Sequence, residues 1–292
     1  MTADRTVPDR PTPARAPAVP AAPATAARTP ADTAAVHPAP VHHPGATRRQ
    51  PRPWLLMYHS VSDGLHDPYR IAVSPHRLRR QLRWLRARGL RGVGVGELLR
   101  ARAAGRGAGL VGLTFDDGYQ DFLDEAVPLL LEHGCTATVF VLPGRLGGTN
   151  AWDPLGPRRP LLSEPAIRAA AGAGMEIGSH GLLHRDLITA GDAALREETA
   201  RSRALLTAVT GGPVAGFCYP YGAVDARAAR AVREAGYGYA CAIDPGPLTG
   251  TYALPRVHIG EQDTGWRLLL KRHLHPLRRR ALTARESMGA GR

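Results

Sequence analysis

Two pairs of polar residues have the types and the spacing that metal-assisted hydrolysis needs. Asp116 and Asp117 stand in tandem directly after the apolar run 110–115, and His180 and His184 lie four residues apart. Two adjacent buried carboxylates repel each other unless a cation or a shared proton offsets the repulsion. Histidines four apart lie on one face of a helical turn, a spacing found in zinc sites. Taken singly, an aspartate before a helix can be an N-cap, and a histidine pair is weak evidence for a metal.

Together the two pairs indicate a more specific site. One carboxylate and two imidazoles form a three-ligand set that leaves positions open for water and a substrate, as a catalytic zinc ion requires. The second carboxylate is then free to act as a base on water. The same ligand types fit a non-haem Fe(II) centre. In those centres the carboxylate usually stands two residues after the first histidine, which is not the arrangement around His180.

The elements that must position these side chains alternate short apolar runs with longer amphipathic ones. Seven such units over about 210 residues predict parallel strands joined by right-handed crossovers, and the number suits a closed barrel. An open doubly wound sheet is the alternative, but Gly92-Val-Gly94-Val-Gly96 lacks the spacing of a dinucleotide-binding turn. We expect strands at 54–58, 110–115, 136–142, 175–177, 215–219 and 237–243, and helices at 74–89, 120–133, 163–174, 192–209 and 225–236. Both polar pairs then follow strand ends, where parallel α/β folds place their chemistry.

These residues resemble the polysaccharide deacetylases, the NodB-homology family also called carbohydrate esterase family 4. The resemblance rests on Thr114-Phe-Asp-Asp-Gly118, His180-x-x-x-His184 and Tyr219-Pro-Tyr-Gly222, which occur in this order. It extends to Met57-Tyr-His-Ser-Val61 and Ala253-Leu-Pro-Arg256, and covers roughly residues 54–260. Each motif alone is unspecific, but the ordered set is highly specific.

The resemblance implies a fold and an activity. The fold is an α/β, distorted (β/α)7 barrel, and the activity is metal-dependent removal of N- or O-acetyl groups from glycans. The metal is a divalent ion, usually Zn²⁺, with Co²⁺, Ni²⁺ or Fe²⁺ as alternatives. The implied roles are general base for Asp116, oxyanion-binding backbone N–H for Tyr221, one wall of the acetyl pocket for Tyr221 and Pro220, and metal ligands for Asp117, His180 and His184.

Three positions depart from the family pattern. Gly181 stands where the second motif usually has Ser or Thr, whose side chain braces the loop by hydrogen bonds. Cys218 stands where the third motif often has an Arg that orients the base. The Leu-x-His motif that supplies the general acid is not literally present. His258 is the nearest candidate, with a surface histidine at a strand end as the alternative.

Two further residues are weaker candidates. His59 follows the first expected strand, and we expect it either to line the same mouth or to make a structural hydrogen bond. Trp152 lies in a loop rich in Gly and Pro, where it would stack on a sugar face or anchor the loop.

The composition divides the chain into three parts. Residues 1–50 are rich in Pro, Ala and Thr, and predict a disordered arm. Residues 51–265 form the expected deacetylase domain, and 266–292 a basic C-terminal helix or tail.

The formal net charge is +13, yet residues 113–266 carry twelve arginines against eighteen acidic residues. Because the basic excess lies outside the middle of the chain, we expect no nucleic-acid partner. The three cysteines form no CxxC pair and are expected in the core rather than in disulfides.

The leading hypothesis is therefore a hydrolase that removes acetyl groups from N-acetylated glycans or amino sugars. An O-acetyl esterase on a glycan and a non-catalytic glycan-binding barrel are the alternatives. No apolar run reaches the ~18 residues of a membrane span, and the N-terminus lacks the apolar centre of a signal peptide. These features predict cytoplasmic action, or action at the cell wall if the start codon is misassigned. The sequence makes no prediction of the oligomeric state.

Overall fold

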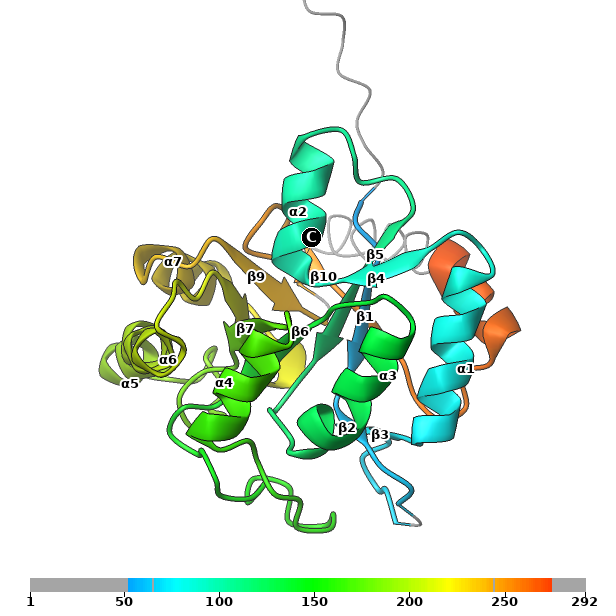
Figure 1. The fold of residues 1–292 in the computed structure, drawn as a ribbon. Coiled ribbons are helices and arrows are strands. Elements are labelled where there is room, and N and C mark those ends of the chain that lie inside the picture. The colour runs from blue at the N-terminus through cyan, green and yellow to red at the C-terminus, as the bar shows by residue number, and fades with distance from the viewer. Residues whose placement is uncertain (1–51, 65, 244, 275–292) are drawn as a thin grey trace, which may run out of the picture. The chain divides into compact units, whose positions relative to one another are not determined.

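A parallel sheet of nine strands forms the centre of the fold (Figure 1). Its order is β10-β9-β8-β7-β6-β5-β1-β11, and β4 pairs with β5. The computed structural model describes residues 52–274 except Leu65 and Asp244. The predicted N-terminal arm and the tail beyond residue 274 lie outside these residues. The strands are β1 (Leu55–Tyr58), β4 (Arg91–Val93), β5 (Leu110–Phe115), β6 (Thr138–Val141), β7 (Glu176–Ser179), β8 (Gly216–Cys218), β9 (Tyr239–Ala242), β10 (Leu254–Pro255) and β11 (Val257–His258).

The sheet nearly closes into a barrel through its last two strands. β10 pairs with β9 at one edge, and β11 pairs with β1 at the other. Arg256 alone separates β10 from β11, so this residue lies where the two edges meet. The predicted distorted (β/α)7 barrel is confirmed, and the open doubly wound alternative is wrong. A separate two-stranded sheet pairs β2 (Ser60–Val61) with β3 (Ala72–Val73).

The helices other than α2 run round the outside of the strands, with α1 beside α3 and α4 beside α6 (Figure 1). Ser74 Oγ caps α1 by accepting the Arg77 N–H at 3.1 Å, and Pro75 occupies the first turn, where its missing N–H costs no hydrogen bond. π-helical turns interrupt two of the expected helices, at Phe122–Ala126 before α3 and at Glu197–Arg201 between α5 and α6. The helices are α1 (Pro75–Arg86), α2 (Val95–Ala103), α3 (Val127–Glu132), α4 (Glu164–Gly172), α5 (Asp192–Arg196), α6 (Ser202–Thr210) and α7 (Ala226–Glu234), followed by helical residues 265–274.

The sequence analysis missed β4 and α2, which occupy the glycine-rich segment 91–103. Glycine carries no side chain and so leaves no apolar periodicity to read. The packing explains one of these glycines, because a Cβ on Gly92 would lie 2.3 Å from Leu113 Cδ1. α2 begins without a side-chain cap of its own. Instead Glu176 accepts the Gly96 N–H at 2.9 Å near the helix start.

The apolar side chains that alternate along the strands belong to two separate clusters. The larger lies between the sheet and the helices and includes Leu56 of β1, whereas Leu55 belongs to the smaller cluster inside the barrel. α2 adds Val95 and Leu98 to the inner cluster, and it lies at the end of the barrel where the strands begin (Figure 1). The opposite end is therefore left for polar side chains. Cys135, Cys218 and Cys241 are buried and free, as expected.

No helix within residues 52–274 is both long enough and apolar enough to span a lipid bilayer.

Candidate active site

The candidate residues follow the carboxyl ends of neighbouring strands. Asp116 and Asp117 follow β5, His180 follows β7, and Cys218 ends β8. The sheet ladder continues into the site, because the Asp116 N–H donates to Tyr58 O at 2.9 Å and the His180 N–H to Val141 O at 2.8 Å. These bonds fix where the side chains leave the barrel. The expectation that strand ends converge on one mouth therefore holds for these elements.

Asp117, His180 and His184 converge on one point. Asp117 Oδ1 lies 3.3 Å from the Nε2 atoms of both histidines. All three side chains are buried. Asp117 and His184 adopt left-handed backbone conformations, with φ of 70° and 67°. Such conformations cost about 1–3 kcal/mol in residues other than glycine, so the surrounding structure holds both residues against a local cost.

These three residues fit a divalent metal ion. Asp117 Oδ1 is buried without a hydrogen-bond partner, and so is His184 Nδ1. A buried carboxylate oxygen without a partner is costly unless a cation offsets it. In a tetrahedral site with metal–ligand distances of about 2.0–2.1 Å, neighbouring ligand atoms lie about 3.3 Å apart, which is the observed spacing. Two imidazoles and one carboxylate suit zinc and other first-row divalent ions.

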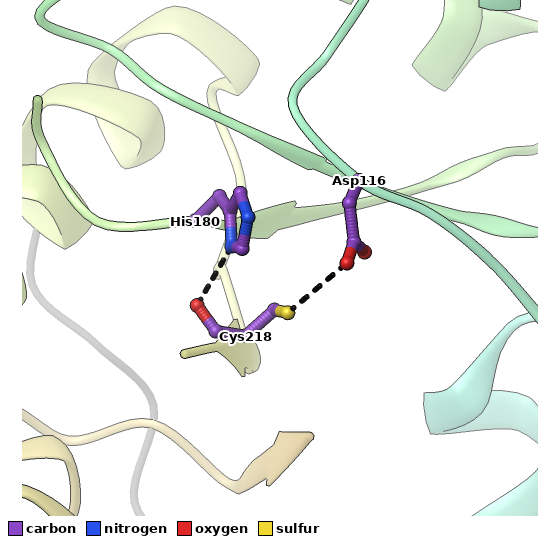
Figure 2. Close-up of side chains that lie close together, drawn as sticks. All are labelled: Asp116, His180 and Cys218. Atoms are coloured by element: carbon purple, nitrogen blue, oxygen red, sulfur yellow. Dashed lines mark hydrogen bonds between the residues drawn. The ribbon is translucent and has the colours of Figure 1, made fainter. Parts of the chain in front are cut away.

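The protonation of Asp117 and His180 also fits a metal site. Burial by itself would raise the pKa of Asp117, but its interactions with His180 and His184 hold that pKa well below its ordinary value. The carboxylate is therefore ionised, as a ligand must be. His180 Nδ1 lies 2.9 Å from the Cys218 carbonyl oxygen (Figure 2). A carbonyl only accepts, so Nδ1 carries a proton, and Nε2 is the nitrogen left to bind a metal.

Asp116 is held by a partner that the sequence analysis did not find. Arg256 donates from Nη1 to Asp116 Oδ1 at 2.6 Å and from Nη2 to Oδ2 at 2.7 Å. Both side chains are buried. Burial would raise the pKa of Asp116, but the charge and the hydrogen bonds of Arg256 outweigh it and lower that pKa below its ordinary value. Asp116 is thus an ionised, oriented carboxylate beside the candidate metal ligands.

Cys218 lies within the same group of side chains. Its Sγ is 3.7 Å from Asp116 Oδ2 (Figure 2) and 2.9 Å from Arg256 Nη2. The guanidinium that orients Asp116 therefore comes from the junction of β10 and β11, not from the Cys218 position. The only sequence signal for Arg256 was its place in the Ala253-Leu-Pro-Arg256 motif.

Two aromatic rings enclose His184. The Trp152 ring stacks on it with centroids 4.7 Å apart and planes at 14°. The Tyr221 ring meets it edge-on at 4.6 Å. Tyr221 is 57% exposed and has φ of 59°, while the neighbouring Pro220 is buried. Trp152 thus packs against a candidate ligand, a contact that neither reading of the sequence foresaw.

His59 and His258 lie beside each other, with ring centroids 6.2 Å apart. His59 Nε2 is 3.8 Å from Asp116 Oδ2, which brings it to the candidate base. His258 lines an open groove of about 1350 Å³ together with Arg256. Burial, and then the charges of His59 and Lys271, lower the pKa of His258 below its ordinary value. Its role as general acid stays a prediction.

Residues 104–240 match the family model described as polysaccharide deacetylase. YxkH of Bacillus subtilis (strain 168), whose name assigns it to the polysaccharide deacetylases, is 26% identical over 216 residues, which is 72% of each chain. Over these residues the chain is similar to the polysaccharide deacetylases.

Two further likenesses are one of the fold and one of a short segment. The deacetylase PplD of Streptococcus pyogenes, solved in complex with acetate, has the same fold, with a TM-score of 0.63 and 22% identity over 75% of this chain and 97% of that one. The poly-β-1,6-N-acetyl-D-glucosamine N-deacetylase of Escherichia coli (strain K12) is 33% identical over 87 residues, which is 27% of this chain and 13% of that protein. The resemblance of the motifs to this family is thereby confirmed.

Proposed function

We propose that this protein is a metal-dependent N-deacetylase of the polysaccharide deacetylase family, which hydrolyses the acetamide of an N-acetylated glycan or amino sugar to acetate and a free amine. The observation that carries the proposal is the convergence of Asp117, His180 and His184 beside Asp116, an ionised carboxylate oriented by Arg256. A barrel that only binds glycans has no need of this cluster. Its carboxylates are costly to bury, and one of their oxygens, Asp117 Oδ1, lies buried without a hydrogen-bond partner, which a cation would offset.

Each of the site residues has a proposed role in the reaction. Asp117, His180 and His184 would hold a divalent ion, most simply Zn²⁺, which when bound polarises the acetyl carbonyl and lowers the pKa of water. Asp116 takes the proton of the attacking water, because its carboxylate is ionised and fixed by Arg256. The backbone N–H of Tyr221 donates to the oxygen that becomes negative. The rings of Tyr221 and Pro220 bound the acetyl group.

The leaving amine needs a proton, and two histidines are candidates to supply it. His258 is the residue that the family pattern suggests. His59 is the other candidate, because its Nε2 lies 3.8 Å from Oδ2 of Asp116, the proposed base. His258→Gln and His59→Gln variants separate the two, because loss of the general acid lowers kcat by about 10²–10⁴-fold. We expect this loss of kcat in His258→Gln. If only His59→Gln shows it, His59 is the general acid instead.

We favour the amide over the ester because the Escherichia coli relative is named for N-deacetylation of an N-acetylglucosamine polymer. The test is acetate release from β-1,6- and β-1,4-linked N-acetylglucosamine oligomers by the metal-free protein, before and after addition of Zn²⁺ or Co²⁺. We expect release only with metal and none from Asp117→Asn. No release by a protein that binds one ion per chain would refute the proposed substrate class. Release that persists without metal would refute the mechanism.

A further inference from the structure

Glu198 is a buried carboxylate that lies outside the sequence motifs named above. Its side chain is 1% exposed, and it lies on the π-helical turn Glu197–Arg201 between α5 and α6. Its neighbour Glu197 is half exposed and pairs with Arg201 on the surface. Burial of a carboxylate is expensive, and π-helical turns are frequent at functional sites. The contacts of Glu198 therefore need a reason.

The Glu198 carboxylate binds the loop that carries the two candidate histidine ligands. Its Oε2 accepts the N–H of Leu182 at 2.7 Å and that of Leu183 at 3.0 Å. These are two of the three residues between His180 and His184. Hydrogen bonds from backbone N–H to a carboxylate are about twice as strong as neutral ones. The carboxylate thus fixes the peptide groups that set the separation of the two imidazoles.

Ser202 extends the same support by one helical turn. Its Oγ donates to Gly181 O at 2.9 Å and lies 2.5 Å from Ser179 Oγ. Ser179 Oγ in turn accepts the Gly181 N–H at 3.2 Å. Together with the two bonds to Glu198, four backbone polar groups of residues 181–183 are held by side chains. Ser179 Oγ accepts one of them, and the other three bonds go to Glu198 and Ser202.

Gly181 leaves the space that this arrangement uses. A Cβ at this position would lie 2.6 Å from Glu198 Oε2, and the φ of +85° favours glycine. The family usually has Ser or Thr here to brace the loop. We propose that Glu198, together with Ser202, is the positioning group that holds the His180–His184 loop in the geometry that binds the metal. This inference rests on the metal site of the proposed function.

The test measures metal affinity rather than turnover. The dissociation constant for Zn²⁺ is determined by competition with a chromophoric chelator in four variants: Glu198→Leu, Glu198→Gln, Ser202→Ala and the control Glu197→Gln. Loss of a group that orients metal ligands typically weakens affinity 10–100-fold. We expect that loss in Glu198→Leu and a smaller one in Glu198→Gln, which keeps an acceptor oxygen. Ser202→Ala should also bind zinc more weakly, and Glu197→Gln should bind it as the native protein does.

Hydrogen exchange of the Leu182 and Leu183 amides is the second readout, and it should quicken in the Glu198 variants. If Glu198 merely stabilises the fold, its substitution should lower the melting temperature equally with and without zinc. Native zinc affinity in Glu198→Gln and Ser202→Ala would overturn the proposal, even if Glu198→Leu does not fold. Native protein that binds zinc but releases no acetate would refute the proposed activity alone. Native protein that binds no zinc would overturn both.

Discussion

Arg256 and Asp116 form a two-pronged ion pair inside the barrel, with Nη1–Oδ1 and Nη2–Oδ2 distances of 2.6 and 2.7 Å. The arginine also donates to Thr114 Oγ1 at 3.0 Å. It joins β10 to β11 where the sheet nearly closes. The residue that links the two edges of the barrel therefore also orients the candidate base, so that closure of the fold and preparation of the site depend on one side chain.

Replacing Arg256 should change the pH dependence of the enzyme. The pKa of Asp116 lies below its ordinary value of 3.8 because Arg256 outweighs burial. Without the guanidinium, only His180 and His59 oppose the effect of burial, and the pKa rises. The base is then protonated at a higher pH, and the acid limb of kcat/KM against pH moves upward in Arg256→Gln. Arg256→Lys keeps the charge and should move it less. Arg168→Gln, at an exposed pair on α4, should leave it in place.

The same pair should govern stability in acid. A lowered carboxyl pKa contributes stability above the ordinary value of 3.8, and this is lost as the pH falls through the lower folded-state pKa. Breaking a buried ion pair costs about 3–5 kcal/mol. Urea unfolding should therefore show Arg256→Gln to be less stable than the native protein at neutral pH, with a gap that narrows below about pH 4. A gap independent of pH would contradict the assigned pairing.

Removing the metal should reduce the effect of one substitution. With zinc at 100 times its dissociation constant, the native protein gains about 2.7 kcal/mol of stability, and Asp117→Asn should not. In chelator this gain is absent, so the two proteins should differ less in stability; what remains is the loss of the interactions of Asp117 with His180 and His184. Thermal unfolding with and without zinc measures both effects. A difference in stability that is equally large with and without zinc would show that Asp117 is structural.

Trp152 should influence the metal through His184. Its ring stacks on that imidazole at 4.7 Å, and an aromatic pair contributes about 0.5–1.5 kcal/mol beyond area burial. Trp152→Ala should weaken zinc binding by about two- to tenfold, whereas Trp152→Phe should keep most of the affinity. Chelator competition distinguishes this from a role in substrate binding alone, in which KM would rise and the zinc affinity would stay unchanged.

The left-handed backbone at Tyr221 should make glycine more favourable than alanine at this position, which reverses the order found inside a helix. Its φ of 59° lies in the left-handed region, which costs residues other than glycine about 1–2 kcal/mol. Tyr221→Gly should therefore be more stable than Tyr221→Ala. At Leu205, within α6, the order should be the opposite, since glycine is about 1 kcal/mol worse than alanine inside a helix. The same order at both positions would contradict the strain at Tyr221.

Local patterns predicted most of the fold. The helix expected at 74–89 corresponds to α1, in which Ser74-Pro75 forms the start and the buried Leu78, Leu82 and Leu85 recur with a helical period. Asp116 and His180 were found because they follow apolar strands, whose carboxyl ends meet in a parallel sheet. These inferences need only neighbouring residues and one rule of topology.

Contacts between distant residues were not predictable in this way. Arg256 lies 140 residues from Asp116, and its pairing depends on how the barrel closes. Glu198 reads as one of two consecutive glutamates in a helix, and nothing in the sequence distinguishes it from Glu197. Only the π-helical turn and the position of Gly181 bring it to the histidine loop. Such partners follow from tertiary structure, so a sequence pattern alone leaves them unassigned.

The most direct test of the proposed activity is the balance of products from one substrate. An N-acetylglucosamine oligomer is incubated with zinc-loaded native protein and with Asp116→Asn of equal zinc content, and acetate and new free amine are both measured. We predict equal amounts of acetate and amine from the native protein, and a loss of both by about 10²–10⁴-fold in the variant. Acetate without amine, or native rates in Asp116→Asn, would contradict the account.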